Sequence, residues 1–367
     1  MKILFIAPIP PPINGQSKAS KVLLDKLQEE NNVEIVNLSK SSLKNGVNSL
    51  NRFSEIFNIL KNVRKKRKNN DIIYLSLAES FAGNMRDLLI YFICRKYLNK
   101  TYIQMLGGAG MKEILTGTSW QRNLNATFMK KIAGVIIEGP INYDSFRTVF
   151  SHNKIHIVPN FAEDFLFVSN EEIEKKFSHV EPIEVLYLSN LIPGKGYNEL
   201  ADAYLLLNNE EQNMINLSFV GGFENAESEG EFMKKIATNK HIKYLGKFID
   251  GKSKRELYLK SHVFCLPTYY PFEGQPISIL EGYATGCAVV TSNHSGIPFI
   301  FKDELNGFMV EKKSVQSLVE VLRKLILQKN SLKKIALYNK DQAFRKYRTE
   351  IYQDKILNIL KNSFNKE

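Results

Sequence analysis

The sequence contains few cysteines, and their spacing argues against two classes of site. Of its 367 residues only Cys94, Cys265 and Cys287 are cysteines; they lie far apart and form no C-x-x-C pair. A structural zinc site or a disulfide framework needs closely or regularly spaced cysteines. We therefore expect three buried thiols in a protein of a reducing compartment, the cytoplasm.

Long hydrophobic runs are also missing. The run from Leu88 to Cys94 is bounded by charged residues and is much shorter than the roughly 20 residues of a membrane-spanning helix. The apolar run at residues 2–8 ends in a proline-rich segment, which favours a buried first strand over a signal peptide. We expect a chain that does not cross a bilayer.

The histidines show no metal-binding pattern. There are six, and only His152 and His156 have a spacing near that of metal ligands, without carboxylates beside them. We interpret that pair as a surface or packing feature. The sequence therefore predicts no metal site.

Short apolar runs alternate with helical patterns along the whole chain, which has 44% hydrophobic and 24% charged residues. This alternation is typical of parallel strands joined by crossover helices. It stops at a polar, acidic stretch around residues 169–176 and then starts again. We predict an α/β protein of two doubly wound, Rossmann-like domains. The predicted parts are residues 1–165, residues 183–344, and a C-terminal helix at 345–367 that returns to the first domain.

A basic amphipathic helix is predicted at residues 53–68. Its apolar positions 53, 56, 57, 60 and 63 share one helical face, and five consecutive basic residues follow at 64–68. The helix either docks on an anionic membrane surface at the inner face of the cell membrane or packs on the sheet with a solvated basic end. The net charge of +12 comes with no nucleic-acid-binding motif, so we expect no nucleic-acid partner.

Residues 269–291 carry the strongest local signal. The order of residue types predicts a loop, a helix that starts with Pro276 and ends at Gly286, and a strand. The loop places Glu273 and unpaired backbone N–H groups at a positive helix terminus. Such a terminus binds phosphate or sugar oxygens.

Glu281 lies inside that predicted helix, on the side that approaches its buried face. A buried carboxylate needs a partner. A vicinal diol such as a ribose would satisfy both oxygens; the alternative is a nearby lysine or solvent. A glycosidase pair with Glu273 is a weaker interpretation, because eight residues of helix span about 12 Å where a retaining hydrolase needs about 5 Å.

The two glutamates, separated by seven residues within Glu-Gly-Gln-Pro-Ile-Ser-Ile-Leu-Glu, resemble the signature of the family four retaining glycosyltransferases. Further segments are similar to that family in the same order: 13–17, 158–160, 186–196, 221–222, 245–246 and 295–298. The resemblance covers most of the chain.

The resemblance implies two facing Rossmann-like domains (the GT-B fold), a nucleotide-diphosphate sugar as donor, most commonly of UDP, and neither metal nor cofactor. It implies that Glu281 holds the ribose, that Glu273 contacts the donor sugar, and that Lys195 neutralises the diphosphate. The implied catalytic residues are Glu273 and Lys195. The implied nucleotide-sugar-binding residues are Gly15, Asn190, Lys195, Gly196, Gly274, Gln275, Pro276, Ile277 and Glu281.

The chain departs from the family pattern at three places. Asn190 stands where arginine is common, which removes one cation from the diphosphate site. Gln104 and Leu106 stand where histidines often precede glycines, so we assign no catalytic histidine. Gly15-Gln16 replaces a pair of glycines on the acceptor side.

Three other functions compete. Residues 246–253 match the P-loop pattern G-x-x-x-x-G-K-[ST], although Phe248 and Ile249 occupy a loop that prefers small residues. A nucleotide-sugar epimerase would use the same two domains. A membrane-surface scaffold would need only the basic helix. We expect a retaining, hexosyltransferase-type enzyme that passes a sugar to a glycan or lipid-linked acceptor in surface polysaccharide or glycolipid assembly.

Overall fold

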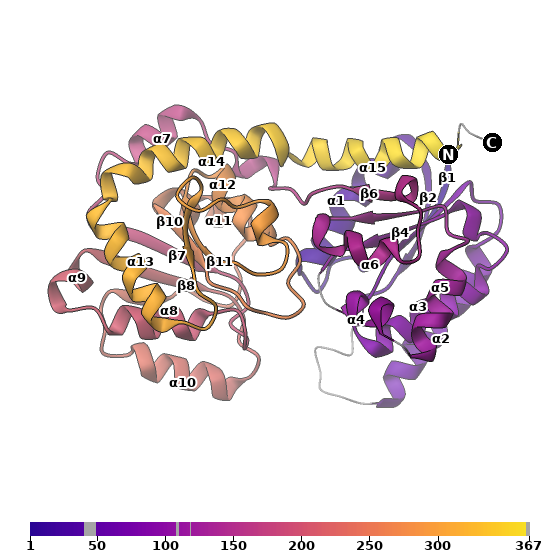
Figure 1. The fold of residues 1–367 in the computed structure, drawn as a ribbon, viewed down its shortest axis with the longest axis horizontal. Coiled ribbons are helices and arrows are strands. Elements are labelled where there is room, and N and C mark those ends of the chain that lie inside the picture. Colours follow the sequence, from indigo (N-terminus) through magenta and orange to yellow (C-terminus); the bar gives the residue numbers. More distant parts are fainter. Residues whose placement is uncertain (40–48, 108–109, 118, 365–367) are drawn as a thin grey trace. The chain divides into compact units, whose positions relative to one another are not determined.

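A computed structural model describes residues 1–39, 49–107, 110–117 and 119–364. The chain divides into two compact units. The first unit contains Met1–Asn160 together with Glu350–Glu367, and the second contains Phe161–Thr349. Figure 1 colours them along the chain, with the first unit in indigo to magenta and its C-terminal segment in yellow.

The first unit is built on a six-stranded parallel sheet in the order β2-β1-β3-β4-β5-β6. Every residue of β3, β4 and β5 is buried, as expected for parallel strands covered on both faces. The strands are β1 (Lys2–Ala7), β2 (Asn32–Asn37), β3 (Ile72–Ser76), β4 (Thr101–Met105), β5 (Gly134–Ile137) and β6 (Ile155–Ile157).

Helices cover both faces of this sheet. In Figure 1, α1 and α15 lie on one side of the strands, and α2, α3 and α5 lie on the other. The helices are α1 (Gly15–Glu30), α2 (Ser49–Lys66), α3 (Phe81–Ile93), α4 (Gly110–Thr116), α5 (Trp120–Met129), α6 (Tyr143–Arg147) and α15 (Thr349–Phe364).

Helix α15 packs on the first unit, as predicted for the C-terminal segment. Tyr352 accepts a hydrogen bond from Gln104 Nε2 on β4 at 3.2 Å, and Gln353 Nε2 donates to the carbonyl of Val22 on α1 at 2.8 Å. The helix begins at Thr349, after the predicted start at 345. Residues 365–367 of that prediction lie outside the described residues.

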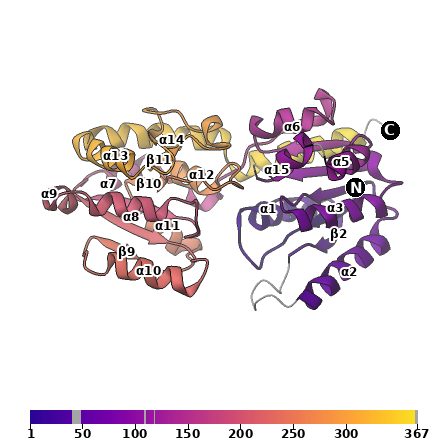
Figure 2. The ribbon, with the colours of Figure 1, turned by 60° about the horizontal axis from the view of Figure 1, so that its bottom comes forward.

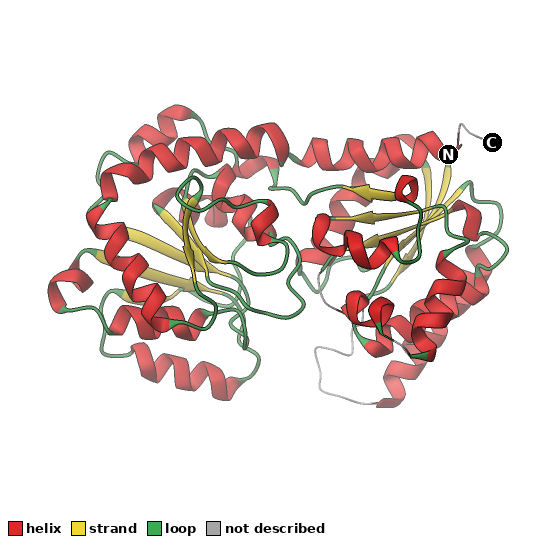
Figure 3. Ribbon diagram, in the orientation of Figure 1, coloured by secondary structure: helices red, strands yellow, loops and turns green. Residues whose placement is uncertain are grey.

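The second unit repeats the architecture. Its six parallel strands have the order β12-β11-β10-β7-β8-β9, and Figure 3 shows them in yellow between red helices. The strands are β7 (Ile183–Leu188), β8 (Ile215–Val220), β9 (Ile242–Tyr244), β10 (Val263–Leu266), β11 (Ala288–Ser292) and β12 (Gly307–Val310). Both units thus confirm the predicted α/β, Rossmann-like class.

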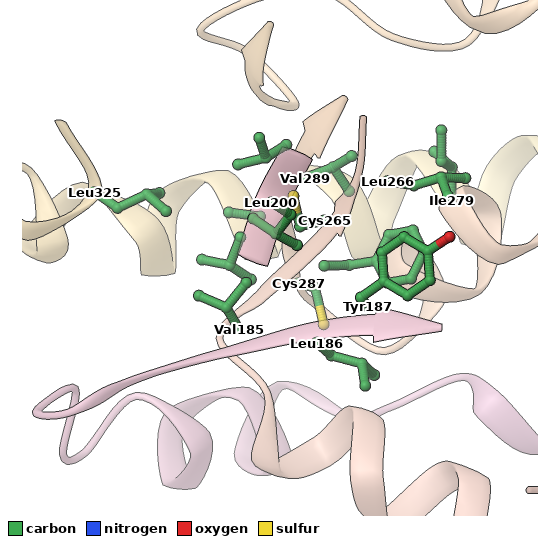
Figure 4. Close-up of a cluster of buried hydrophobic side chains, with 14 of the residues drawn as sticks. Val185, Leu186, Tyr187, Leu200, Cys265, Leu266, Ile279, Cys287, Val289 and Leu325 are labelled. Carbon is green, nitrogen blue, oxygen red and sulfur yellow. The ribbon is translucent and has the colours of Figure 1, made fainter. Parts of the chain in front are cut away.

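The helices of the second unit pack in two groups, with α13 against α8 and α14 against α12. Figure 2 shows α8 and α10 near β9. The core between the strands and the helices includes Tyr187, Leu200, Cys265 and Ile279, which point toward one another in Figure 4. The helices are α7 (Asn170–Lys176), α8 (Tyr197–Leu205), α9 (Asn209–Asn213), α10 (Ala226–Ile236), α11 (Gly251–Lys260), α12 (Ile277–Ala284), α13 (Val315–Leu327) and α14 (Leu332–Lys346).

The boundary between the units lies earlier than the sequence suggested. We expected it at 165–182, whereas it falls between Asn160 and Phe161. Leu166 and Ile173 are fully buried in the core of the second unit, because the polar stretch forms α7 with a capping box at Ser169 and turns Ile173 inward. Polar composition at that place marks an amphipathic helix and not a linker.

Two further expectations concern buried cysteine thiols and membrane-spanning helices. All three cysteines are buried and free, and burial raises the pKa of the Cys94 thiol to about 12. Within the part of the chain that the structure describes, no helix has both the length and the apolar character to cross a membrane.

In helix α2, the apolar residues predicted at 53–68 are only partly buried. Val63 and Ile59 are buried, with 0% and 7% exposure, whereas Phe53 and Phe57 are 73% and 67% exposed. The C-terminal half of α2 packs on the unit's core, so its buried face includes Ile59 in place of the predicted position 57. The two phenylalanines are left outside that core.

Candidate active site at the carboxyl edge of the second sheet

The predicted donor residues of the second unit meet where three neighbouring strands end. β11, β10 and β7 are adjacent and parallel, so the loops at 189–196, 267–276 and 293–296 leave the same edge of the sheet. The chain order reverses between β10 and β7. Ligands of open α/β sheets bind at such switch points, beyond the carboxyl ends of the strands.

Two glycines let the loop after β7 lie against the loop after β10. Gly194 and Gly196 have φ values of +90° and +79°, in the left-handed region that L-residues with side chains rarely adopt. A Cβ on Gly196 would lie 2.3 Å from the carbonyl oxygen of Pro267. The backbone therefore needs glycine here, and the close approach places Lys195 beside the second loop.

Lys195 and Glu273, the two predicted catalytic residues, form an ion pair. The Lys195 Nζ lies 2.7 Å from Glu273 Oε2, and the two side chains are 13% and 9% exposed. The Thr268 hydroxyl donates to the same oxygen at 2.9 Å. The ammonium group also lies 5.0 Å from the centre of the Tyr270 ring. The site thus holds one cation and one carboxylate in largely desolvated surroundings, where charges interact more strongly than in water.

The loop that carries Glu273 is tied to the loop after β11. The N–H of Gly296 donates to the carbonyl of Gly274 at 3.2 Å, and the Ser295 hydroxyl donates to the carbonyl of Glu273. The His294 Nε2 lies 2.7 Å from the carbonyl oxygen of Tyr270. Sequence reasoning missed Thr268, Tyr270 and Ser295, because nothing in their local pattern distinguishes them from ordinary loop residues.

Helix α12 begins one residue later than predicted. Pro276 is its N-cap, with an extended ψ of 117°, and Ile277 is the first helical residue. Gly274, Gln275 and Pro276 are buried and Ile277 is half-buried. The N-terminus of α12 therefore follows the Glu273 loop directly, as the sequence indicated.

Glu281 is buried on α12, with 2% exposure. Lys254 Nζ lies 2.6 Å from its Oε1, and the Tyr258 hydroxyl donates to its Oε2 at 3.2 Å. Burial, followed by the charge of Glu281, holds the pKa of Tyr258 well above its usual value, so the phenol keeps its proton. Of the alternatives weighed for Glu281, pairing with a lysine is the one observed. Ribose binding stays a prediction.

Two further predicted binding residues are Asn190 and Gly15. Asn190 is exposed, and its carbonyl accepts from the Tyr187 hydroxyl at 3.1 Å. Gly15 belongs to the first unit, where it opens α1 next to the Asn14 cap. A cavity of about 380 Å³ at the carboxyl ends of β1, β2 and β3 is lined by Pro8, Pro12, Asn14, Gln16, Leu38, Ser39, Ala78, Ser80, Ala82, Gly83 and Arg86.

A larger cavity, of about 830 Å³, opens at the opposite edge of the second sheet. Its lining includes Glu184 and His262, which lie at the start of β7 and just before β10. Its lining contains both lysines and glutamates. The predicted donor residues of the second unit lie at the switch point, where the charged pair and the helix terminus coincide, and none of them lines this larger cavity.

The P-loop pattern at 246–253 does not form a phosphate cradle. The side chain of Lys252 is 91% exposed and lies 3.9 Å from Glu256 on the same helix, and Phe248 is 62% exposed. The segment follows β9, the edge strand of the sheet. Elsewhere, the described residues contain no group of three or more His, Cys, Asp or Glu side chains that could hold a metal.

Residues 168–342 match the family of glycosyl transferases group 1. This part of the chain belongs to that family. The match contains the loop of Lys195, the Glu273 loop and helix α12, so it covers the whole donor-side cluster of the second unit.

Two curated bacterial proteins are similar to this chain. One is the amylovoran biosynthesis glycosyltransferase AmsK of Erwinia amylovora, 25% identical over 40% of this chain and 36% of that protein. The other is the Campylobacter jejuni N,N'-diacetylbacillosaminyl-diphospho-undecaprenol alpha-1,3-N-acetylgalactosaminyltransferase, 29% identical over 53% of this chain and 49% of that protein. The chain therefore spans half or less of the length of these relatives.

Solved structures show the fold. The chain resembles HepE of Anabaena, a structure in complex with UDP-glucose, with a TM-score of 0.73, 16% identity, and coverage of 99% of this chain and 100% of that one. The chain thus has the GT-B fold predicted for its two Rossmann-like domains.

Proposed function

We propose that the protein is a retaining glycosyltransferase that moves a sugar from a nucleotide-diphosphate sugar to a hydroxyl of a glycan or lipid-linked acceptor, in surface polysaccharide or glycolipid biosynthesis. The observation that carries the proposal is the pair Lys195–Glu273, 2.7 Å apart, at the switch point and beside the N-terminus of α12. A cation, a carboxylate and a helix N-terminus together suit a diphosphate joined to a sugar.

The chemistry follows from the charges. As the bond between the sugar's C1 and the diphosphate oxygen breaks, negative charge grows on the leaving diphosphate. Lys195 and the N–H groups at the start of α12 stabilise that charge, and Glu273 accepts hydrogen bonds from the donor sugar. The acceptor oxygen bonds to C1 on the face that the diphosphate leaves, and its proton passes to the leaving phosphate oxygen. The product keeps the donor's anomeric configuration.

UDP is the nucleotide we propose, and no metal is required in the proposed step because Lys195 supplies the neutralising cation. The support for UDP is the similar fold of HepE, a structure in complex with UDP-glucose. The support for a lipid-linked acceptor is the similarity to the Campylobacter jejuni N,N'-diacetylbacillosaminyl-diphospho-undecaprenol alpha-1,3-N-acetylgalactosaminyltransferase. The cavity of about 380 Å³ in the first unit, beside Gln16, offers a place for acceptor groups.

We further propose that α2 binds the anionic inner face of the cell membrane, where a lipid-linked acceptor resides. Phe53 and Phe57 are exposed, and the last turn of the same helix carries Arg64, Lys65 and Lys66. Exposed aromatic side chains insert at the lipid boundary, and basic side chains attract anionic headgroups.

Flotation with vesicles tests this surface. The protein should float with phosphatidylglycerol vesicles and much less with phosphatidylcholine vesicles, and Phe53→Ser with Phe57→Ser should remove most of the binding. Leu327→Ser is the matched control, because Leu327 is 84% exposed on the second unit. Equal flotation of the double variant and the control would contradict the proposal.

The function is tested by turnover of a panel of nucleotide sugars, with and without a lipid-linked diphosphate sugar acceptor. We expect release of nucleoside diphosphate that depends on the acceptor, and a product whose anomeric proton coupling matches that of the donor. Acceptor-independent conversion of one nucleotide sugar into another would identify an epimerase instead. A product of inverted configuration would refute the retaining step alone.

A further inference from the structure

Helix α11 supplies two partners of the buried carboxylate Glu281. Lys254 Nζ lies 2.6 Å from Oε1, and the two side chains are 6% and 3% exposed. The hydroxyl of Tyr258 donates to Oε2 at 3.2 Å. Since each oxygen has its own donor, the plane of the carboxylate cannot turn without breaking one of the two contacts.

Lys254 also lies near a second carboxylate. Its Nζ is 3.8 Å from Glu163 Oε2, in the segment that enters the second unit. The next residue of α11, Arg255, donates to the carbonyl of Phe165 at 2.8 Å. One ammonium group thus lies between two carboxylates. Such a cluster favours hydrogen-bond donors, such as hydroxyl groups, and disfavours phosphate.

The N-terminus of α12 and the middle of the helix, where Glu281 stands, therefore present different groups. The Glu273 loop presents Lys195 and the helix N-terminus, which suit the diphosphate, whereas the buried trio of Lys254, Glu281 and Glu163 suits a neutral diol. A ribose presents two hydroxyls at a fixed spacing, so reading both of them requires a carboxylate held in one orientation.

We propose that Lys254 is a positioning residue of the donor site, which fixes the orientation and charge of Glu281 so that the carboxylate recognises the ribose diol of the nucleotide. This inference rests on the proposed function, because it requires a bound nucleotide. It assigns a role to a residue on another helix, outside the loop and helix that carry the two glutamates.

The test compares UDP with 2'-deoxy-UDP by calorimetry. In the wild type, UDP should bind more tightly than the deoxy analogue. Lys254→Met should lower this preference about tenfold, the size of one charged hydrogen bond. Lys254→Arg should retain most of it, since a guanidinium keeps the charge. Lys252→Met is the matched control, on the same helix and with a 91% exposed side chain, and should leave the preference unchanged.

Thermal unfolding of each variant reports whether the fold survives the loss of a buried partner. Tyr258→Phe provides a second, milder variant: it removes one hydroxyl, keeps the ion pair, and should also reduce the preference for UDP. If Lys254→Met folds and still prefers UDP over 2'-deoxy-UDP as strongly as the wild type, the positioning role is overturned and the proposed function stays intact. If Lys254→Met does not fold, an unchanged preference in Tyr258→Phe has the same meaning. No UDP binding by the wild type overturns both.

Discussion

At the residue scale, the pair of Lys195 and Glu273 combines two inferences that the sequence made separately. The resemblance to the glycosyltransferase family implied a lysine that neutralises the diphosphate at position 195, and it separately implied a carboxylate near the donor sugar at position 273. The structure places their charged atoms 2.7 Å apart. The Lys195 ammonium and the Glu273 carboxylate therefore hold each other in place before any ligand arrives, which is the preorganisation that catalytic groups need.

A double-mutant cycle tests this coupling. Lys195→Met and Glu273→Gln should each lower kcat/KM about 10- to 100-fold, the loss expected for one charged hydrogen bond. The double variant should lose less than the sum of the two, because the side chains are in contact. Lys21→Met, which removes an exposed lysine paired with Asp25, serves as the control. Additive losses at the two sites would mean that they act independently.

Glu281 shows where residue-level prediction ends. The sequence required a partner for its carboxylate and named a lysine as one alternative, yet Lys254 stands 27 residues earlier. The helical pattern of α11 indicates which of its residues share a face, but not which helix that face meets. The identity of the partner is a property of tertiary packing and could not be derived from spacing.

At the element scale, sequence patterns predicted the strands and the helix of the donor site closely. The second domain was predicted to start at residue 183, and its first strand is observed as Ile183–Leu188. The helix predicted from Pro276 to Gly286 is observed as Ile277–Ala284. The sequence left open whether the apolar face of residues 53–68 packs on the sheet or docks on a membrane, because periodicity alone does not tell which side of a helix meets the sheet. Ile59 is buried and Phe57 is exposed, where the pattern had placed Phe57 on the apolar face.

Gly196→Ala should destabilise the loop between β7 and α8. An added Cβ would face the Pro267 carbonyl at 2.3 Å in a backbone with a φ of +79°, and such a conflict costs about 1 to 3 kcal/mol. Gly230→Ala is the opposite case, because no heavy atom lies within 4 Å of the new Cβ. Because alanine favours a helix more than glycine does, Gly230→Ala in helix α10 should raise the free energy of unfolding by about 1 kcal/mol. Urea denaturation measures the free energy of unfolding of both variants. Equal changes in Gly196→Ala and Gly230→Ala would show that the backbone at Gly196 is not strained by a side chain.

His262 makes the second unit less stable in acid. Its ring accepts from the N–H of Glu184 at 3.0 Å and lies 3.1 Å from the carbonyl oxygen of Lys176. Burial lowers the pKa of His262 to about 4. The folded state therefore binds fewer protons than the unfolded state between about pH 4 and 6.5, so stability is full above 6.5 and falls as the pH drops toward 4.

Between pH 7 and pH 5 this one group should remove about 2 kcal/mol of unfolding free energy. Denaturation at both pH values, for the wild type and for His262→Gln, isolates the contribution. The variant should show a smaller loss than the wild type over the same interval. An equal loss in both proteins would show that His262 is not the responsible group.

At the scale of the whole molecule, the two-domain organisation and the returning C-terminal helix follow from strand periodicity and from a helical tail without a further strand. The exact boundary between the two units could not be predicted from the sequence. The polar residues of α7 look like a linker in sequence, although Ile173 of that helix is fully buried. The residues of the proposed donor site lie in the second unit, while Gly15 and helix α2 belong to the first. If both proposals hold, substitutions in one unit should change donor binding and substitutions in the other should change membrane binding.

The most direct test of the central claim is binding of a panel of nucleotide sugars to the purified protein, for the wild type and for Lys195→Ala and Glu281→Ala, with ATP as control. We predict that one nucleotide sugar binds and that each substitution weakens it by about 1 to 3 kcal/mol, the loss of a charged hydrogen bond. Binding of ATP alone, controlled by Lys252, would contradict the account and assign the function to the P-loop pattern instead.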